Sequence, residues 1–81
     1  MDVIKQQVRD FITQEIYVDA SPDEIQDTTN LLDSGILDSL STLRLVEFLE
    51  QTYQIKIAPH ELSEDYISTI NQIADLVRSK K

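Results

Sequence analysis

The chain has 81 residues, no cysteine and a formal net charge of −8. This length suits one small domain, so we expect residues 1–81 to form a single domain. The absence of cysteine excludes disulfides and thiolate metal sites. The acidic balance argues against nucleic acid and anionic membranes as partners, because both call for a basic protein face. Proteins with basic patches are the natural complement.

We find neither a signal peptide nor a membrane-spanning segment in the sequence. The first ten residues, MDVIKQQVRD, lack the continuous apolar core of a signal peptide. No apolar run approaches the length that spans a bilayer. We therefore expect a cytoplasmic protein without membrane insertion.

Residues 2–16 are predicted to form an amphipathic helix. Their apolar residues recur at spacings of three and four, which places them on one stripe of a helix. The polar residues between them fall largely on the opposite side. The predicted core-facing residues are Val3, Ile4, Val8, Phe11, Ile12 and Ile16.

A long connection follows over residues 17–38 and contains the only glycine, Gly35. The segment SPDE (21–24) is typical of a helix start, so we expect one or two helical turns there. Connections of this length are unusual in compact domains and are often functional. Four apolar residues are expected to hold the connection against the core, namely Leu31, Leu32, Ile36 and Leu37.

Residues 39–54 are predicted to form the second long helix. The segment QIKIAP (54–59) ends it, and the alternation of Ile55 and Ile57 with Lys56 indicates a short extended piece. The predicted inward stripe of the helix consists of Leu45, Phe48, Leu49 and Thr52.

Two features complete the predicted fold. One or two helical turns are expected within residues 59–66, and Ser68 is expected to cap a last helix. No pair of strands is predicted. The fold class is therefore all-α, a small four-helix bundle with three main helices, a short third helix and a long first loop. The inward residues of the last helix are Ile70, Ile73, Ala74 and Val77.

The chain offers little catalytic chemistry of its own. His60, the only histidine, follows Pro59 in a polar connection, where we expect it to be solvated. A serine hydrolase needs a base beside its serine, and one glycine cannot form a phosphate-binding glycine loop. The segment DASPDEIQDTTN (19–30) resembles a calcium loop in spacing but lacks the central glycine and the final glutamate. We therefore expect no catalytic residue and no metal site.

Two serines each follow an aspartate after a short apolar run, in LLDS and ILDS. Ser34 precedes Gly35, which continues a helix poorly. Ser39 precedes the amphipathic run LSTLRLVEFLE and so lies at a helix N-terminus, with Asp38 just before it. Free backbone N–H groups and the positive end of the helix dipole favour a phosphate there. Simple capping of the helix by Ser39 or Asp38 explains the same pattern without any modification.

The segment GILDSLSTLRLVEFLEQTYQIKI resembles the prosthetic-group site and second helix of acyl and peptidyl carrier proteins. Their hallmark is an Asp-Ser-Leu triplet at the start of the second helix, here Asp38-Ser39-Leu40. The triplet is specific only in this context, after a glycine-containing loop and before an apolar helix. The resemblance extends over nearly the whole chain and implies a free-standing phosphopantetheine-binding carrier.

The resemblance implies a prosthetic group in place of catalysis. Ser39 would carry 4′-phosphopantetheine, donated from coenzyme A by a phosphopantetheinyl transferase that uses magnesium. The thiol of the arm would hold an acyl or aminoacyl group as a thioester and deliver it to a downstream acyl-accepting enzyme. Tethering replaces diffusion by a high effective concentration. A monomer is expected for such a shuttle.

Partner contacts are expected on the second helix near the arm, where Arg44 stands at a position that is commonly acidic in fatty-acid carriers. The segment ILDSLSTLRLV resembles free-standing carriers more closely than fatty-acid carriers. Such free-standing carriers are served by an adenylate-forming ligase, and D-alanyl carriers and carriers of natural-product pathways are of this kind. A carrier of fatty-acid or polyketide synthesis is the alternative, and an unmodified acidic helical interaction module is a third. For Leu43, core packing is an equal alternative. The expected contacts are Leu37, Leu40, Leu43, Arg44 and Glu47.

Overall fold

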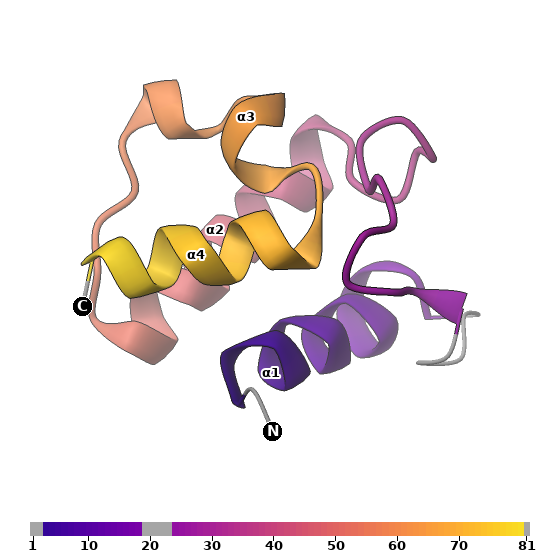
Figure 1. Ribbon diagram of the computed structural model, residues 1–81, viewed down its shortest axis with the longest axis horizontal. Helices are drawn as coiled ribbons and strands as arrows, with labels where there is room; N and C mark the ends of the chain where they lie inside the picture. Colours follow the sequence, from indigo (N-terminus) through magenta and orange to yellow (C-terminus); the bar gives the residue numbers. More distant parts are fainter. Residues whose placement is uncertain (1–2, 19–23, 81) are drawn as a thin grey trace.

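The computed structural model describes residues 3–18 and 24–80, and Figure 1 shows their arrangement. These residues form helices and no strands, so the predicted all-α fold with three main helices and a short third helix is confirmed. None of the described helices is long and apolar enough to cross a membrane. The elements in chain order are α1 (Val3–Phe11), the π-helical turn η1 (Ile12–Ile16), α2 (Ser39–Tyr53), the 3-10 turn η3 (Pro59–Glu61), α3 (Glu64–Ile67) and α4 (Ile70–Lys80).

The apolar stripes of the three main helices meet in one core. In Figure 1, α4 crosses in front of α2, with α1 below it and α3 above it. The four inward residues predicted for α4 are all fully buried, and so are Leu45 and Leu49 of α2. From α1 and η1, Val8 and Ile12 are fully buried in this core. Three further residues of this segment are partly buried, namely Ile4, Phe11 and Ile16.

Two members of the predicted inward stripes lie elsewhere. Val3 is 63% exposed, because it is the first residue of α1 and extends past the edge of the core. Thr52 is exposed, whereas Thr42 is buried. The buried stripe of α2 therefore begins at Thr42 and passes from Leu49 to Tyr53, one full turn on, instead of to Thr52.

The predicted first helix is continuous over the described residues 3–16, but its last turn is a π turn. The Tyr17 N–H donates to the Ile12 carbonyl, five residues back, at 2.7 Å. Glu15 lies on this turn and pairs with Arg44 of α2 at 3.4 Å. The wider turn thus brings an acidic residue of the first helix to the side of the second.

The first loop is held to the core by leucines and by turn chemistry. Leu31 and Leu37 are buried, and the Leu37 N–H donates to the Leu31 carbonyl at 2.9 Å. Gly35 turns the chain between them with a φ of +82°, a backbone conformation that residues with side chains rarely adopt. Leu32 and Ile36 are half-buried, so all four predicted anchors are confirmed. The turns predicted at SPDE fall largely on residues 19–23, outside the described residues.

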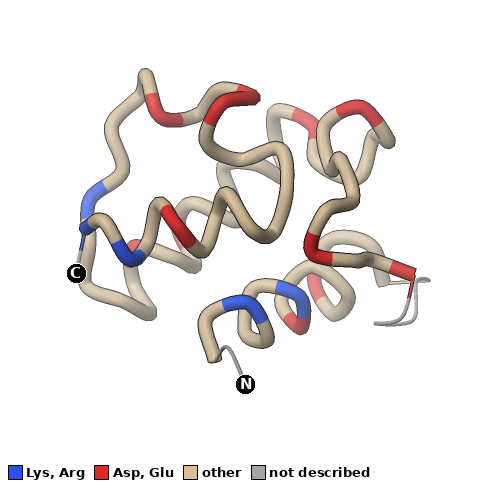
Figure 2. Tube along the Cα trace, in the orientation of Figure 1, with Lys and Arg blue, Asp and Glu red and all other residues tan. Residues whose placement is uncertain are grey.

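Charged groups of α1 fasten the beginning of this loop. The Arg9 Nε donates to the Ile25 carbonyl at 3.0 Å, and the Arg9 guanidinium also pairs with the Asp27 carboxylate. The Asp27 carbonyl accepts the Asn71 N–H of α4 at 3.1 Å. Figure 2 shows acidic residues in the loop and in α3, and basic residues on α1 and near the end of α4. Ile25, an anchor that we did not predict, is buried at this point.

The cap of α4 differs from the prediction by one residue. Thr69 precedes the helix, and its hydroxyl accepts the Gln72 N–H at 3.1 Å. Ser68 is buried, and its hydroxyl donates to the Glu64 carbonyl of α3. Ser68 therefore closes the end of α3, and Thr69 caps α4.

Glu61 holds the turn η3 against the end of α4. Its carboxylate accepts the Ala58 N–H at 2.8 Å and pairs with the Lys80 ammonium group. The hydrogen bond from Lys80, followed by that from Ala58, lowers the pKa of the Glu61 carboxyl. The ionised carboxylate is thus the form that the fold stabilises.

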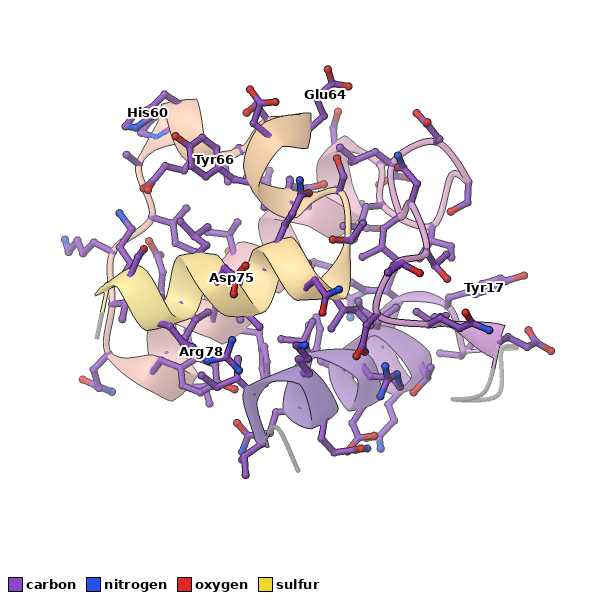
Figure 3. All side chains as sticks on the ribbon, in the orientation of Figure 1. Tyr17, His60, Glu64, Tyr66, Asp75 and Arg78 are labelled. Atoms are coloured by element: carbon purple, nitrogen blue, oxygen red, sulfur yellow. The ribbon has the colours of Figure 1, made fainter. Side chains whose placement is uncertain are left out.

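Replacing Glu61 by glutamine is therefore expected to destabilise the protein at neutral pH more than in acid. A carboxyl with a lowered folded pKa stabilises above its unfolded pKa, roughly 4.3, and this contribution is lost as the pH falls through the folded pKa. The melting temperatures of wild type and Glu61→Gln should differ at pH 7 and converge below pH 4. Glu64→Gln is the matched control, because Figure 3 shows Glu64 pointing away from the bundle. A constant difference at every pH would contradict the assignment.

Candidate functional site

The Asp38 side chain caps the start of α2. Asp38 has extended backbone angles and is the N-cap, and its Oδ1 accepts the Ser41 N–H at 2.8 Å. The first backbone bond of the helix follows from the Thr42 N–H to the Asp38 carbonyl at 2.8 Å. The pKa of the Asp38 carboxyl is lowered, first by the hydrogen bond from the Ser41 backbone N–H and next by a hydrogen bond from the Ser41 side chain. Asp38 is thus the ionised cap of a 15-residue helix.

Ser39 is the first residue of α2, and its side chain is exposed. Among the contacts of the described residues, its hydroxyl has no hydrogen-bond partner. Ser34 is also exposed, but it lies in a turn and its hydroxyl donates to the Leu31 carbonyl at 3.3 Å. Since Asp38 does the capping, the Ser39 hydroxyl is left available for another role.

An open hollow of about 490 Å³ lies beside Ser39. Its walls come from three separate parts of the chain, the first loop, α2 and the residue after η3. Four of the lining residues are leucines, so the floor of the hollow is apolar. The residues that line it are Leu32, Leu37, Asp38, Ser39, Thr42, Leu43 and Leu62.

The residues predicted to contact partners divide into two groups. Leu40 and Leu43 are 69% and 53% exposed, and Arg44 and Glu47 are also exposed. The core-packing alternative for Leu43 is therefore wrong. Leu37 is only 3% exposed, because the first loop folds it into the core. Its expected role as a direct contact is corrected to support of the hollow.

His60 is not among the residues around Ser39. It is exposed, as predicted, and its ring meets the edge of the Tyr66 ring at 6.3 Å, with 82° between the ring planes. Figure 3 shows these two side chains together, over α3 and η3. The hydroxyl of Ser39 therefore has no histidine base of the kind that a serine hydrolase uses.

The sequence profile of the family described as "Phosphopantetheine attachment site" matches residues 6–77. The chain belongs to this carrier family. Its members bear a covalent 4′-phosphopantetheine group on a serine, and the carrier itself is not an enzyme. The predicted family, cofactor and absence of catalysis are thus confirmed.

Individual relatives include D-alanyl carrier proteins. The D-alanyl carrier protein of Lactococcus lactis subsp. lactis is 31% identical over 78 residues, which cover 96% of each chain. That of Streptococcus uberis is 37% identical over 49 residues, 60% of this chain and 62% of the relative. A chain in a solved structure described as "Crystal structure of FAD-dependent dehydrogenase" is 31% identical with a TM-score of 0.77, covering 86% of this chain and 97% of that one.

The residues at the start of α2 fit the carrier's prosthetic group. A phosphodiester on Ser39 would meet the positive end of a long helix, which favours negative charge. The leucine-lined hollow would accept the arm that follows the phosphate. When bound, the group supplies a thiol that forms a thioester, and this chain supplies the hydroxyl, the helix end and the apolar support.

The sequence had no signal for two walls of this hollow. Leu62 follows η3 in the chain, and the neighbouring Glu61 pairs with Lys80 of α4, which helps to hold this turn beside the bundle. Thr42 lies one turn after Asp38, and its burial depends on the packing of α2 against the loop. Neither residue type suggests a binding site by itself.

Proposed function

We propose that Ser39 is the attachment residue and that the protein carries a small aminoacyl group, with D-alanine as the first candidate. The cargo is held as a thioester on the 4′-phosphopantetheine arm. The main support is the Ser39 hydroxyl, which is exposed at the first position of α2, has no partner among the described residues and lies next to the leucine-lined hollow. Ser34 is the less suitable serine, because its hydroxyl is bonded within a turn.

A small cargo is supported by the packing as well as by the D-alanyl carrier relatives. The large side chains of the core are almost completely buried, and the hollow beside Ser39 lies open at the surface. A long acyl chain could be shielded from water only by inserting into this packed core and separating its side chains. D-alanine is polar and does not need to be buried. The alternative of fatty-acid or polyketide synthesis is therefore less favoured.

The proposed partners act in sequence on the arm. A phosphopantetheinyl transferase would attach it to Ser39, an adenylate-forming ligase would load the thiol, and a downstream enzyme would accept the aminoacyl group. The exposed leucines of α2, Leu40 and Leu43, would meet these enzymes close to the arm. Exposed apolar side chains beside a reacting group are typical of transient docking surfaces.

Intact-mass measurement tests the proposal in two steps. The protein is incubated first with coenzyme A, magnesium and a broad-specificity transferase, and then with ATP, D-alanine and a D-alanine-specific ligase. We expect a phosphopantetheinyl mass gain, followed by a D-alanyl gain that L-alanine and a medium-chain fatty acid do not give. A folded protein without the first gain would favour an unmodified interaction module. The first gain without D-alanyl loading would reject the proposed cargo.

Reversing the charge of Arg44 is expected to slow loading by the ligase. Arg44 is about half exposed on α2, and its ion pair with Glu15 is a surface pair, so the Arg44→Glu variant should remain folded. A lost charge contact with the ligase should lower kcat/KM for loading by about tenfold. Arg78→Glu, the same charge change on α4, is the control. Equal loading of both variants would exclude Arg44 as a ligase contact.

A further inference from the structure

A second surface lies where α2 packs against α1 and η1, and it shares no residue with the hollow beside Ser39. Its centre is the stacked pair of Phe11 and Phe48, with ring centroids 4.4 Å apart and 18° between the ring planes. Both rings are half-buried, so they pack against the core and remain partly accessible. The ring pair thus forms an apolar floor at the molecular surface.

Two hollows meet at this pair of rings, and together with the rings we call them the aromatic groove. The larger hollow, about 480 Å³, has further walls from α1, η1 and α2, namely Gln7, Asp10, Gln14, Glu15 and Thr52. The smaller, about 240 Å³, has further walls from α2, namely Arg44, Glu47 and Gln51. Each hollow is large enough to seat one apolar side chain of a partner.

The rim of the aromatic groove is acidic. It holds the carboxylates of Asp10, Glu15 and Glu47 and a single guanidinium, that of Arg44. Arg44 pairs with Glu15 at 3.4 Å, so its charge is already matched. The remaining two carboxylates flank an apolar floor without a cation of their own among the described ion pairs.

We propose that the aromatic groove docks an amphipathic helix of a partner protein. Two apolar side chains of that helix would lie on either side of the ring pair, as in other helix-in-groove interfaces. Lysine or arginine residues on its flanks would face Asp10 and Glu47. We choose a basic helix as the partner because the acidic rim would attract and orient positively charged side chains.

The same charges disfavour the other occupants. A second copy of this chain would bring two acidic rims together, and like charges across an interface oppose association. An anionic membrane would be repelled by the rim and by the net charge of −8. A docked helix would leave Ser39 free, since the aromatic groove and the hollow beside Ser39 have separate walls. The docking would therefore not require the arm, although it would cover Arg44, the proposed ligase contact.

A titration followed by ¹H–¹⁵N NMR tests this docking on the unmodified full chain. The probe is a synthetic helical peptide with leucine and phenylalanine on one face and lysines on both flanks. We expect saturable shifts centred on Phe11, Phe48 and Thr52. Glu47→Lys should weaken binding about tenfold, whereas Glu64→Lys, the same charge change at an exposed site on α3, should stay within about twofold.

Three results would overturn the proposal. Shifts that are absent at millimolar peptide would mean that the groove binds no such helix. Equal weakening by Glu47→Lys and Glu64→Lys would mean that the peptide follows net charge alone. Shifts at the groove that grow with protein concentration and without peptide would assign it to self-association. Because the protein is unmodified in this titration, none of these results depends on whether Ser39 carries the arm.

Discussion

The Ser39→Ala variant is expected to fold normally and to gain no mass from coenzyme A and a phosphopantetheinyl transferase. The substitution removes the Oγ atom to which the phosphodiester would bond. It leaves the helix intact, because Asp38 supplies the cap and the Ser39 hydroxyl has no partner among the described residues. The change in unfolding free energy should therefore stay within about 0.5 kcal/mol.

Ser34→Ala is the control for this experiment, because Ser34 also follows an aspartate in the first loop. It should take up the arm like the wild type when both are followed by intact-mass spectrometry. A mass gain in Ser39→Ala and none in Ser34→Ala would move the attachment to Ser34. Circular dichroism shows whether each variant is folded, so that a lost mass gain can be assigned to the missing hydroxyl and not to unfolding.

The largest stability effect is expected at Leu45, which is completely buried in the middle of α2. Leu45→Ala removes apolar contacts and leaves a cavity, a change that costs about 2 to 5 kcal/mol. A domain of this size has a total stability of roughly 4 to 12 kcal/mol. The variant should therefore melt at least about 10 °C lower than the wild type.

Leu43→Ala is the matched control, because it is the same substitution two residues away on the same helix. Leu43 is 53% exposed, so its removal should change the unfolding free energy by less than about 1 kcal/mol. Urea denaturation at constant m-value measures both variants. Comparable losses for the two leucines would show that Leu43 belongs to the core and would remove it from the proposed docking face of the carrier.

The helices were predictable because each one carries a strong periodic pattern. The four residues predicted to face inward from α4 are buried, together with Leu76, which we did not predict, and α2 begins at the predicted Ser39. The misplaced residues lie at the ends of elements. Val3 has the right spacing but extends past the edge of the core as the first residue of α1, and Thr52 is exposed because the buried stripe passes to its neighbour Tyr53. Ser68 and Thr69 are equally good caps by residue type. Such positions depend on where the neighbours stop, which no local pattern contains.

The candidate site was predictable in part for a similar reason. An aspartate and a serine before an amphipathic run place a hydroxyl at a helix end, and this requires only local sequence. The sequence could not decide whether Asp38 or Ser39 caps the helix, because both side chains can accept the same N–H groups. The backbone angles of Asp38 and its bond to Ser41 decide this choice. They leave the Ser39 hydroxyl available for the proposed attachment.

By itself the sequence determined the all-α class, the order of the helices, the carrier resemblance and the position of Ser39. The resemblance follows from similarity to a known family, and the rest follows from short-range periodicity and residue chemistry, which do not depend on how the helices pack. Only the tertiary structure decided that Leu37 is buried while Leu43 is exposed. Only it brought Leu62 to the hollow beside Ser39 and stacked Phe11 on Phe48. These contacts join residues far apart in the chain, and their geometry is set by how the helices pack.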